Sequence, residues 1–230
     1  YGVHCPKLET LNCSNTKIAG LYLDDCPNLK TLDCSNTQID ELHPESCPQL
    51  RTLDCSNTRI AGELDLRTCP NLQTFNCSNT QISYLELDCP NLQTLDCSNC
   101  HFDSELSLSG LPKLAVFKCQ NNSELGLIYG LETSVNLQTF DCSNCGSLSE
   151  IEGLSYCKKL KTFNCENCNL EYPEVLDFSG FAELQTLKCA NNQFKKLNVS
   201  NCPKLQTLSC KYNQLTTLNV KNCTALTYLD

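Results

Sequence analysis

Cysteine is the residue type in this chain with the greatest capacity for chemistry. The 230 residues include 21 cysteines but only three histidines, and three pairs of cysteines have the C-x-x-C spacing. Two of these pairs would supply four thiolates if they came together, and four thiolates can hold zinc or an iron–sulfur cluster. Those four residues are Cys142, Cys145, Cys165 and Cys168. A thioredoxin-like role would use a helix N-terminus that lowers a thiol pKa, and no helical pattern follows any of the pairs.

The cysteines follow a repeat that covers the whole chain. The letters LDCSNT stand at 32–37 and 53–58, and FNCSNT stands at 75–80. Alignment on the Cys-Pro pairs gives ten units and the opening of an eleventh. They begin at residues 5, 26, 47, 69, 89, 111, 135, 157, 181, 202 and 223. The pattern L-x-x-L-x-C-x-x-(N/T/C)-x-(L/I) at this period is the signature of leucine-rich repeats.

Each unit predicts one strand and one inward turn. Counting from the first leucine, position 4 is Leu or Phe and position 6 is always Cys, while positions 3, 5 and 7 are nearly all polar. This alternation is typical of a strand with one buried face. Position 9 is Thr, Asn or Cys, and we expect it to turn inward and hydrogen-bond loop backbone groups that would otherwise lack partners.

The repeat register accounts for every cysteine without a metal. Ten cysteines stand at position 6, three at position 9, and eight open a unit. Cysteine is small, apolar and often fully buried, which suits a narrow core. Neighbouring strands lie about 4.8 Å apart, farther than the Cβ–Cβ distance of about 3.8 Å that a disulfide prefers. We therefore expect mostly reduced thiols and no metal or other cofactor, with the four cysteines named above as the alternative metal site.

The back half of most units repeats the L-x-x-L-x-L spacing, as in Ile18 to Leu23 and Ile82 to Leu87. Nested halves with cysteine in the front half resemble the bacterial subclass called IRREKO leucine-rich repeats, over residues 5–230. The back halves are too short for helices. The expected fold over residues 1–230 is therefore a single leucine-rich-repeat solenoid. It should have a curved parallel β-sheet on the concave face, short strand-like or turn segments on the back, and almost no α-helix. Leu125 and Leu148 fall one residue late and Tyr172–Glu174 adds a bulge, which should disturb the superhelix.

Composition and motifs exclude several functions. The net charge is −9, and residues 1–115 hold 7 Lys/Arg against 15 Asp/Glu, so nucleic acid is not an expected partner. No apolar stretch approaches the about 18 residues that span a bilayer. His4, His43 and His101 are far apart in the pattern, and no nucleotide-binding loop or catalytic triad stands out. The serines of the CSN segments form a repeated row that we expect on a solvated surface. We expect no enzyme.

What remains is the exposed side of the predicted sheet. We predict a non-catalytic module that binds a protein or a glycan, in adhesion or in interaction with a host or other partner. Residues that interrupt or charge the polar rows are the candidate contacts: Lys30, Arg51, Asp33, Asp54, Asp96, Val116, Lys118, Asp141, Glu166, Lys188, Lys211 and Tyr212. The same rows are equally compatible with plain stacking of strands. A structural spacer or self-assembling solenoid is the alternative, and ice binding by the threonine row is a minor one.

Location and ends complete the expectations. The resemblance implies a secreted or cell-surface protein, while many reduced thiols also suit a cytoplasmic one. Terminal units of solenoids normally carry polar caps, and neither end of the sequence has one. This pattern predicts either a fragment of a longer protein or end-to-end self-association through an exposed strand.

Overall fold

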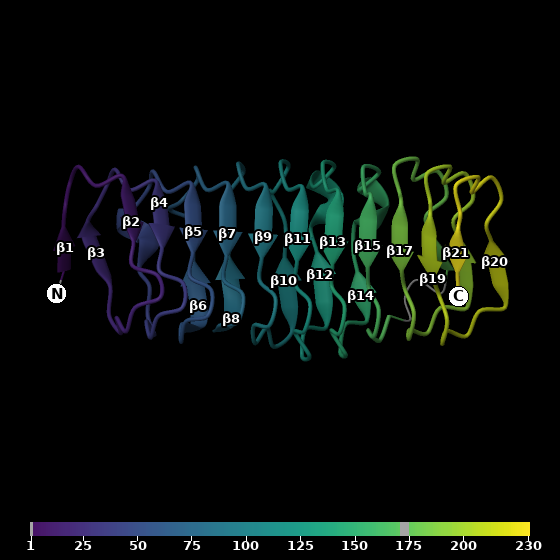
Figure 1. Cartoon of the computed structure of the whole chain (residues 1–230), viewed down its shortest axis with the longest axis horizontal. Coiled ribbons are helices and arrows are strands. Elements are labelled where there is room, and N and C mark those ends of the chain that lie inside the picture. The colour runs from purple at the N-terminus through teal and green to yellow at the C-terminus, as the bar shows by residue number, and fades with distance from the viewer. Residues whose placement is uncertain (1, 171–174) are drawn as a thin grey trace.

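One parallel sheet of eleven short strands runs along the molecule (Figure 1). The structure is a computed structural model that describes residues 2–170 and 175–230. The strands follow one another in chain order, with the N-terminus and the C-terminus at opposite ends of the long axis. They are β2 (Thr10–Asn12), β4 (Thr31–Asp33), β5 (Thr52–Asp54), β7 (Thr74–Asn76), β9 (Thr94–Asp96), β11 (Val116–Lys118), β13 (Thr139–Asp141), β15 (Thr162–Asn164), β17 (Thr186–Lys188), β19 (Thr207–Ser209) and β21 (Tyr228–Leu229).

Identical repeat positions pair across neighbouring strands. Thr31 pairs with Thr52, and Asp33 pairs with Asp54. In the strands of this long sheet from β4 to β19, the residue at position 4 is fully buried. Positions 3 and 5 of these strands stay at least partly exposed, except for Ser209. A slip by one residue would reverse this pattern, so the alternation of apolar and polar residues fixes the register.

The turn after each strand has a recurring hydrogen-bond pattern. Asp33 Oδ1 accepts bonds from the Ser35 N–H at 3.1 Å and from the Ser35 hydroxyl at 2.7 Å. Asn36 then adopts a positive φ of 56°, which asparagine tolerates better than most residues. The expectation that the CSN serines lie on a solvated surface is wrong for four of the six. The serines at positions 35, 56, 98 and 143 are buried because each hydroxyl bonds the carboxylate two residues earlier.

A second turn opens each unit and ties it to the previous one. The Leu50 N–H donates to the Cys47 carbonyl at 3.0 Å, and the Asn71 side chain donates to the Pro48 carbonyl of the unit before it at 3.1 Å. In the seventh unit Ser134 fills the buried place that cysteine has elsewhere. Its hydroxyl bonds the Leu111 carbonyl, and Val135, the expected start, is 45% exposed.

The back of the solenoid consists of short strands and 3₁₀ turns, as expected. The strands are β1 (Gly2–His4), β3 (Tyr22–Asp25), β6 (Ala61–Asp65), β8 (Gln81–Glu86), β10 (Glu105–Ser107), β12 (Leu127–Tyr129), β14 (Glu150–Ile151), β16 (Val175–Asp177), β18 (Lys196–Asn198) and β20 (Thr217–Asn219). The 3₁₀ helices are η1 (Pro44–Ser46), η2 (Leu131–Thr133) and η3 (Leu154–Tyr156). Residues 2–170 and 175–230 contain no α-helix, so the fold expectation is confirmed.

The departures from the repeat are absorbed in turns where the structure describes them. Leu125 and Leu148, each one residue late, are fully buried. Their N–H groups donate to the Asn122 and Cys145 carbonyls at position 9, so the extra residue stays in the turn. The predicted bulge at Tyr172–Glu174 lies outside the described residues.

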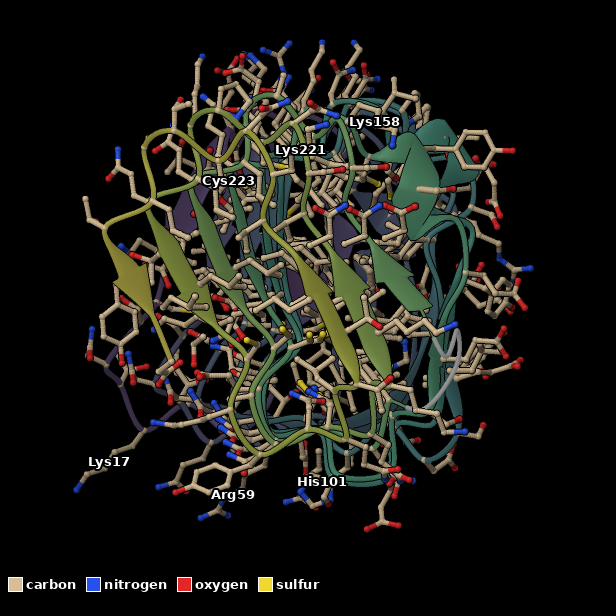
Figure 2. The ribbon with its side chains drawn as sticks, turned by 90° about the vertical axis from the view of Figure 1, so that its right-hand side faces the viewer. Lys17, Arg59, His101, Lys158, Lys221 and Cys223 are labelled. Atoms are coloured by element: carbon tan, nitrogen blue, oxygen red, sulfur yellow. The ribbon has the colours of Figure 1, made fainter. Side chains whose placement is uncertain are left out.

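The core is continuous and includes a stack of aromatic rings. Buried apolar side chains extend from Leu21 to Cys210 without interruption between units. Phe117, Phe140 and Phe163 occupy position 4 of three adjacent strands, with ring centroids 4.9 and 5.1 Å apart. Figure 2 shows the sulfur atoms inside the coil, while Lys17, Arg59 and His101, all at position 10, point outward from one edge.

Candidate binding face

The outward side of the long sheet, formed by positions 2, 3, 5 and 7 of the units, is here called the front face. Its central feature is a row of threonines at position 3 that pair in register from strand to strand. Most of these threonines are partly buried, since crowded β-branched side chains pack against one another on a pleated surface. From β2 to β19 this row is interrupted only at Val116, and Tyr228 takes the same position on the last strand.

Carboxylates at position 5 are held by donors on both oxygens. Besides the serine donors on its Oδ1, the Asp33 carboxylate receives a bond on Oδ2 from the Asn12 amide at 3.2 Å. The Asp54 Oδ2 receives the Asn76 amide at 3.1 Å. Asp33 and Asp54 are in-register neighbours, so these donors offset the repulsion between their like charges. The acidic row is therefore ordered before any ligand arrives.

Strand β11 breaks all three outward rows at once. Val116 replaces threonine, Lys118 replaces Asp or Asn, and Gln120 replaces serine. The Lys118 ammonium lies 3.5 Å from the Asp96 carboxylate, and Asp141 pairs with Lys118 on the other side. Because the Lys118 side chain has no acceptor, it cannot form the turn bond that Asp96 and Asp141 form on the neighbouring strands. Among the described residues, the buried Gln120 Oε1 has no hydrogen-bond donor.

Beyond β15 the front face carries charges that are partly used inside the fold. The Glu166 carboxylate accepts a bond from the Ser209 hydroxyl two units away at 3.1 Å. The residue between them at position 7 is the small Ala190. The Lys211 ammonium lies 3.0 Å from the Asp230 carboxylate and lowers the pKa of Asp230. Lys188 is exposed on β17.

The remaining predicted contacts lie at the margins of this face. Lys30 forms an ion pair with Glu9 at 2.9 Å in the row at position 2, where Arg51 is exposed. Tyr212 is 74% exposed and lies on the turn after β19. It takes a φ of 54° where the other units have asparagine. The structure thus brings together Asp96, Lys118 and Asp141 around β11 and Asp33 with Asp54 near the N-terminal end, whereas the other basic candidates are spread along the sheet.

A row of exposed amides at position 8 was missed by the sequence reasoning. The amide N–H of each of these asparagines donates to the Oδ1 of the one before it, at 2.8 to 2.9 Å. The row consists of Asn99, Asn121, Asn144, Asn167 and Asn191. The signal was the asparagine that follows Cys-x in nearly every unit. This recurring asparagine indicates both the positive φ of the turn and the ladder of side-chain hydrogen bonds.

The cysteines are packed as thiols. None of the 21, all of which lie in the described ranges, forms a disulfide. Burial raises the pKa of the Cys34 thiol to about 12, so such thiols stay neutral at physiological pH. Many sulfurs donate to backbone carbonyls; the Cys202 thiol, for example, lies 3.1 Å from the Phe178 carbonyl oxygen.

Position 9 satisfies backbone carbonyls in three ways. Thr58 donates to the carbonyl of position 6 in its own unit, Cys55, at 2.7 Å. Cys145 donates instead to position 6 of the previous unit, Cys119, at 3.2 Å. Asn122 does both, to Cys119 at 2.7 Å and to Cys97 at 3.0 Å. The inward turn predicted for this position is confirmed.

Three of the four candidate metal ligands donate to separate backbone carbonyls. Cys142 donates to the Asn164 carbonyl, Cys145 to the Cys119 carbonyl, and Cys168 to the Cys142 carbonyl. Within residues 2–170 and 175–230, no three His, Cys, Asp or Glu side chains form a group that could hold a metal ion. The same ranges contain no helix long and apolar enough to cross a membrane.

Comparison with known proteins agrees with this geometry. The family described as "Leucine Rich repeats (2 copies)" matches residues 6–45 and 48–89, and "Leucine Rich Repeat" matches residues 91–114. The chain is a leucine-rich-repeat solenoid. A comparison with curated proteins gives no match.

Solved structures of similar fold come from several sources. The leucine-rich repeat domain of APL1B has a TM-score of 0.72 at 23% identity, over 88% of the solenoid and 60% of that chain. An internalin, InlF, from Listeria monocytogenes has a TM-score of 0.56 at 17% identity, over 97% of the solenoid and 86% of that chain. YopM from Yersinia enterocolitica has a TM-score of 0.53 at 20% identity, over 100% and 61%. The solenoid thus spans less than two thirds of the APL1B and YopM chains, and the identities show the fold alone.

Proposed function

We propose that the front face binds an extended segment of a partner protein and that β11 is the centre of the contact. Leucine-rich repeats are typical of protein-interaction modules, and solenoids present long surfaces to extended partners. The observation that carries the proposal is the simultaneous change of Val116, Lys118 and Gln120, because β11 is the only strand of the long sheet from β2 to β19 that departs from all three rows. Stacking alone accounts for a row of identical residues but gives no reason for three replacements on one strand.

The three side chains offer complementary chemistry within one strand. Val116 is a partly exposed apolar surface, Lys118 is a cation, and Gln120 Oε1 is an acceptor without a donor. A buried acceptor without a partner costs free energy, so an outward turn of the Gln120 side chain toward a polypeptide N–H would be favoured on binding. The flanking Asp96 and Asp141 favour basic residues on either side of an acidic one. The preferred segment is therefore an extended peptide with an acidic residue between basic residues.

The experiment is selection of a displayed random peptide library on the purified chain, followed by anisotropy titration of the selected peptides. Enriched peptides should carry an acidic residue with basic neighbours. Lys118→Glu should weaken their binding about tenfold, which is about 1.4 kcal/mol. The melting temperature should fall only slightly, because the exposed ion pair contributes about 0–1 kcal/mol and the new repulsion from Asp96 and Asp141 is of similar size. Selection on the Lys118→Glu protein should replace the central acidic residue by a basic one.

Lys113→Glu is the matched control for this test. Lys113 is exposed on the turn that opens the sixth unit and bonds the Asn91 amide oxygen at 2.7 Å, so its reversal changes the net charge equally but lies off the front face. If both reversals weaken binding to the same extent, the attraction is nonspecific and β11 is not the centre. Loss of binding only on Tyr22→Ala and Tyr84→Ala would place the contact on the back.

The other candidate roles predict different results in the peptide selection and in related binding assays. A glycan-binding module should select no peptide but should bind on a glycan array, and a spacer should do neither. Ice binding by the threonine row would appear as thermal hysteresis, although the charged row at position 5 beside it disfavours an ice surface. A secreted or cell-surface location is part of the proposal and is supported by the resemblance of the cysteine-containing repeat to the bacterial subclass.

A further inference from the structure

Three pairs of thiols connect neighbouring units inside the solenoid. In each pair a cysteine at position 6 contacts the cysteine at position 9 of the next unit. The pairs are Cys77 with Cys100, Cys119 with Cys145, and Cys142 with Cys168. The position-9 sulfur lies 3.1 to 3.2 Å from the carbonyl oxygen of its partner cysteine, and burial, together with the position-9 thiol, raises the pKa of the position-6 thiol in each pair.

The position-9 thiols differ in how they reach the surface: Cys168 of the third pair is partly exposed, whereas Cys100 is nearly buried but borders a hollow. Cys100 lines a surface hollow of about 320 Å³. The other residues of this hollow are Asn99, His101, Phe102, Asn121, Ser123 and Glu124. Cys145 has the same thiol partner geometry but is 0% exposed, against 5% for Cys100. Cys77, the partner of Cys100, is fully buried.

The two sulfurs of the first pair are also chemically unequal. The hydrogen bond from the Cys77 thiol, followed by those from the Thr80 hydroxyl and N–H, lowers the pKa of Cys100 in spite of its burial. Burial raises the pKa of Cys77 well above its usual value. Cys100 therefore gives up its proton first, and its thiolate is the nucleophile, while Cys77 stays protonated behind it.

We propose that Cys77 and Cys100 form a dithiol site that a small, polar disulfide compound oxidises through this hollow. The Cys100 thiolate attacks one sulfur of the compound, its S–S bond breaks, and one small thiolate leaves. Cys77 then attacks the Cys100 sulfur, the second small thiolate leaves, and the proton of Cys77 passes to that leaving thiolate. Two protein thiols are thereby oxidised to one disulfide, and one small disulfide is reduced to two small thiols.

The polar lining of the hollow defines the class of compound. Asn99 and Asn121 present amides, Ser123 a hydroxyl, His101 an imidazole and Glu124 a carboxylate. A hydrophilic disulfide with amino and carboxylate groups fits this lining better than an apolar one does. The product bond would join position 6 of the fourth unit to position 9 of the fifth, and it would cross-link two neighbouring coils.

The test uses the fully reduced, folded chain and oxidised glutathione as the probe. After timed exposure, acid quenching and alkylation, peptide mapping without reduction should find Cys77 linked to Cys100. Cys119 and Cys145 are the internal control because they share the pair geometry without the hollow, and they should be recovered alkylated. A link between Cys97 and Cys100, equal oxidation of the control pair, or an unmodified Cys100 would overturn the proposal.

Single variants separate the two steps. Cys77→Ala should stop the reaction at a glutathione adduct on Cys100, since the resolving thiol is gone. Cys100→Thr introduces the residue that the first four units have at position 9 and should abolish both adduct and link. Cys145→Thr is the matched control and should leave the rate of Cys77–Cys100 formation unchanged. Far-UV circular dichroism establishes that each variant is folded, and an unchanged link in Cys100→Thr digests would refute the assignment.

Discussion

The side chain at position 9 carries the backbone hydrogen bonding of each inward turn. Threonine bonds its own strand, cysteine bonds the previous unit, and asparagine bonds both. The amide donor of Asn122 therefore links two coils, and the residue is fully buried. Removal of a buried donor leaves its acceptors without partners, at about 1–3 kcal/mol. The choice of residue at this position sets how strongly neighbouring units are tied.

A graded series at Asn122 tests this account. Asn122→Leu should destabilise the chain most, because the Cys97 and Cys119 carbonyls both lose their donor; we expect about 2–3 kcal/mol. Asn122→Thr should keep the bond to Cys119, and Asn122→Cys should keep the bond to Cys97, so each should cost about 1 kcal/mol. Urea unfolding followed by circular dichroism measures all three.

The exposed Asn121 is the control position for the series. Its amide belongs to the surface ladder, so Asn121→Ala should affect unfolding through the positive φ and not through a buried carbonyl. Equal losses for Asn122→Leu and Asn122→Thr would contradict the hydrogen-bond account and would leave side-chain volume as the cause.

At the scale of elements, the strands were predictable and their irregular neighbours were not. The Leu-x-Cys alternation and the asparagine turn recur locally in each unit, so the pattern alone places strands such as β5 and β7. The seventh unit differs because Ser134 takes the buried opening place, and a serine before an apolar valine gives no sign of this. The candidate residues of the front face were identified one by one, but the missing donor at Gln120 depends on side-chain geometry.

The phenylalanine stack is an element that exists only in three dimensions. Phe117, Phe140 and Phe163 lie one unit apart, at the position where most other units have leucine. Tilted rings at 4.9 and 5.1 Å add about 0.5–1.5 kcal/mol for each pair beyond their burial. The central ring takes part in both pairs, so it should contribute more than a phenylalanine that stands alone.

Substitution of the central ring tests this element. Phe140→Ala should cost about 3–5 kcal/mol as a buried aromatic replaced by a cavity. Phe140→Leu should cost about 1–2 kcal/mol plus the loss of two ring pairs. Phe75→Leu is the control, because Phe75 is equally buried at position 4 but lies outside the stack. Equal losses for the two leucine variants, measured by urea unfolding, would show that the rings contribute through burial alone.

At the scale of the whole molecule, the cysteine rows connect the stability of the solenoid to alkaline pH. Burial, together with nearby charges, raises the pKa of Cys34, Cys47, Cys89 and Cys157 from 9.0 to about 12. Each of these side chains is fully buried, and the thiols are spread over units along the coil. Because every unit packs only on its neighbours, loss of a proton in one unit weakens the interfaces on both sides.

The sign of this effect follows from proton binding in the two states. Between pH 9 and about 12 the folded chain keeps the protons of these thiols while the unfolded chain releases them. The stability contributed by these protons is therefore complete below pH 9 and falls as the pH rises toward about 12. The slope is about 1.4 kcal/mol per pH unit for each proton. We expect the urea midpoint to fall steeply across this window under reducing conditions.

The double variant Cys34→Ala/Cys89→Ala should be less stable at pH 8 yet lose stability with a slope smaller by about two protons. Cys5→Ala, at an exposed thiol, should keep the original slope. Lysine and tyrosine ionisation is common to all three proteins, so identical slopes would mean that the buried thiols do not control the alkaline transition.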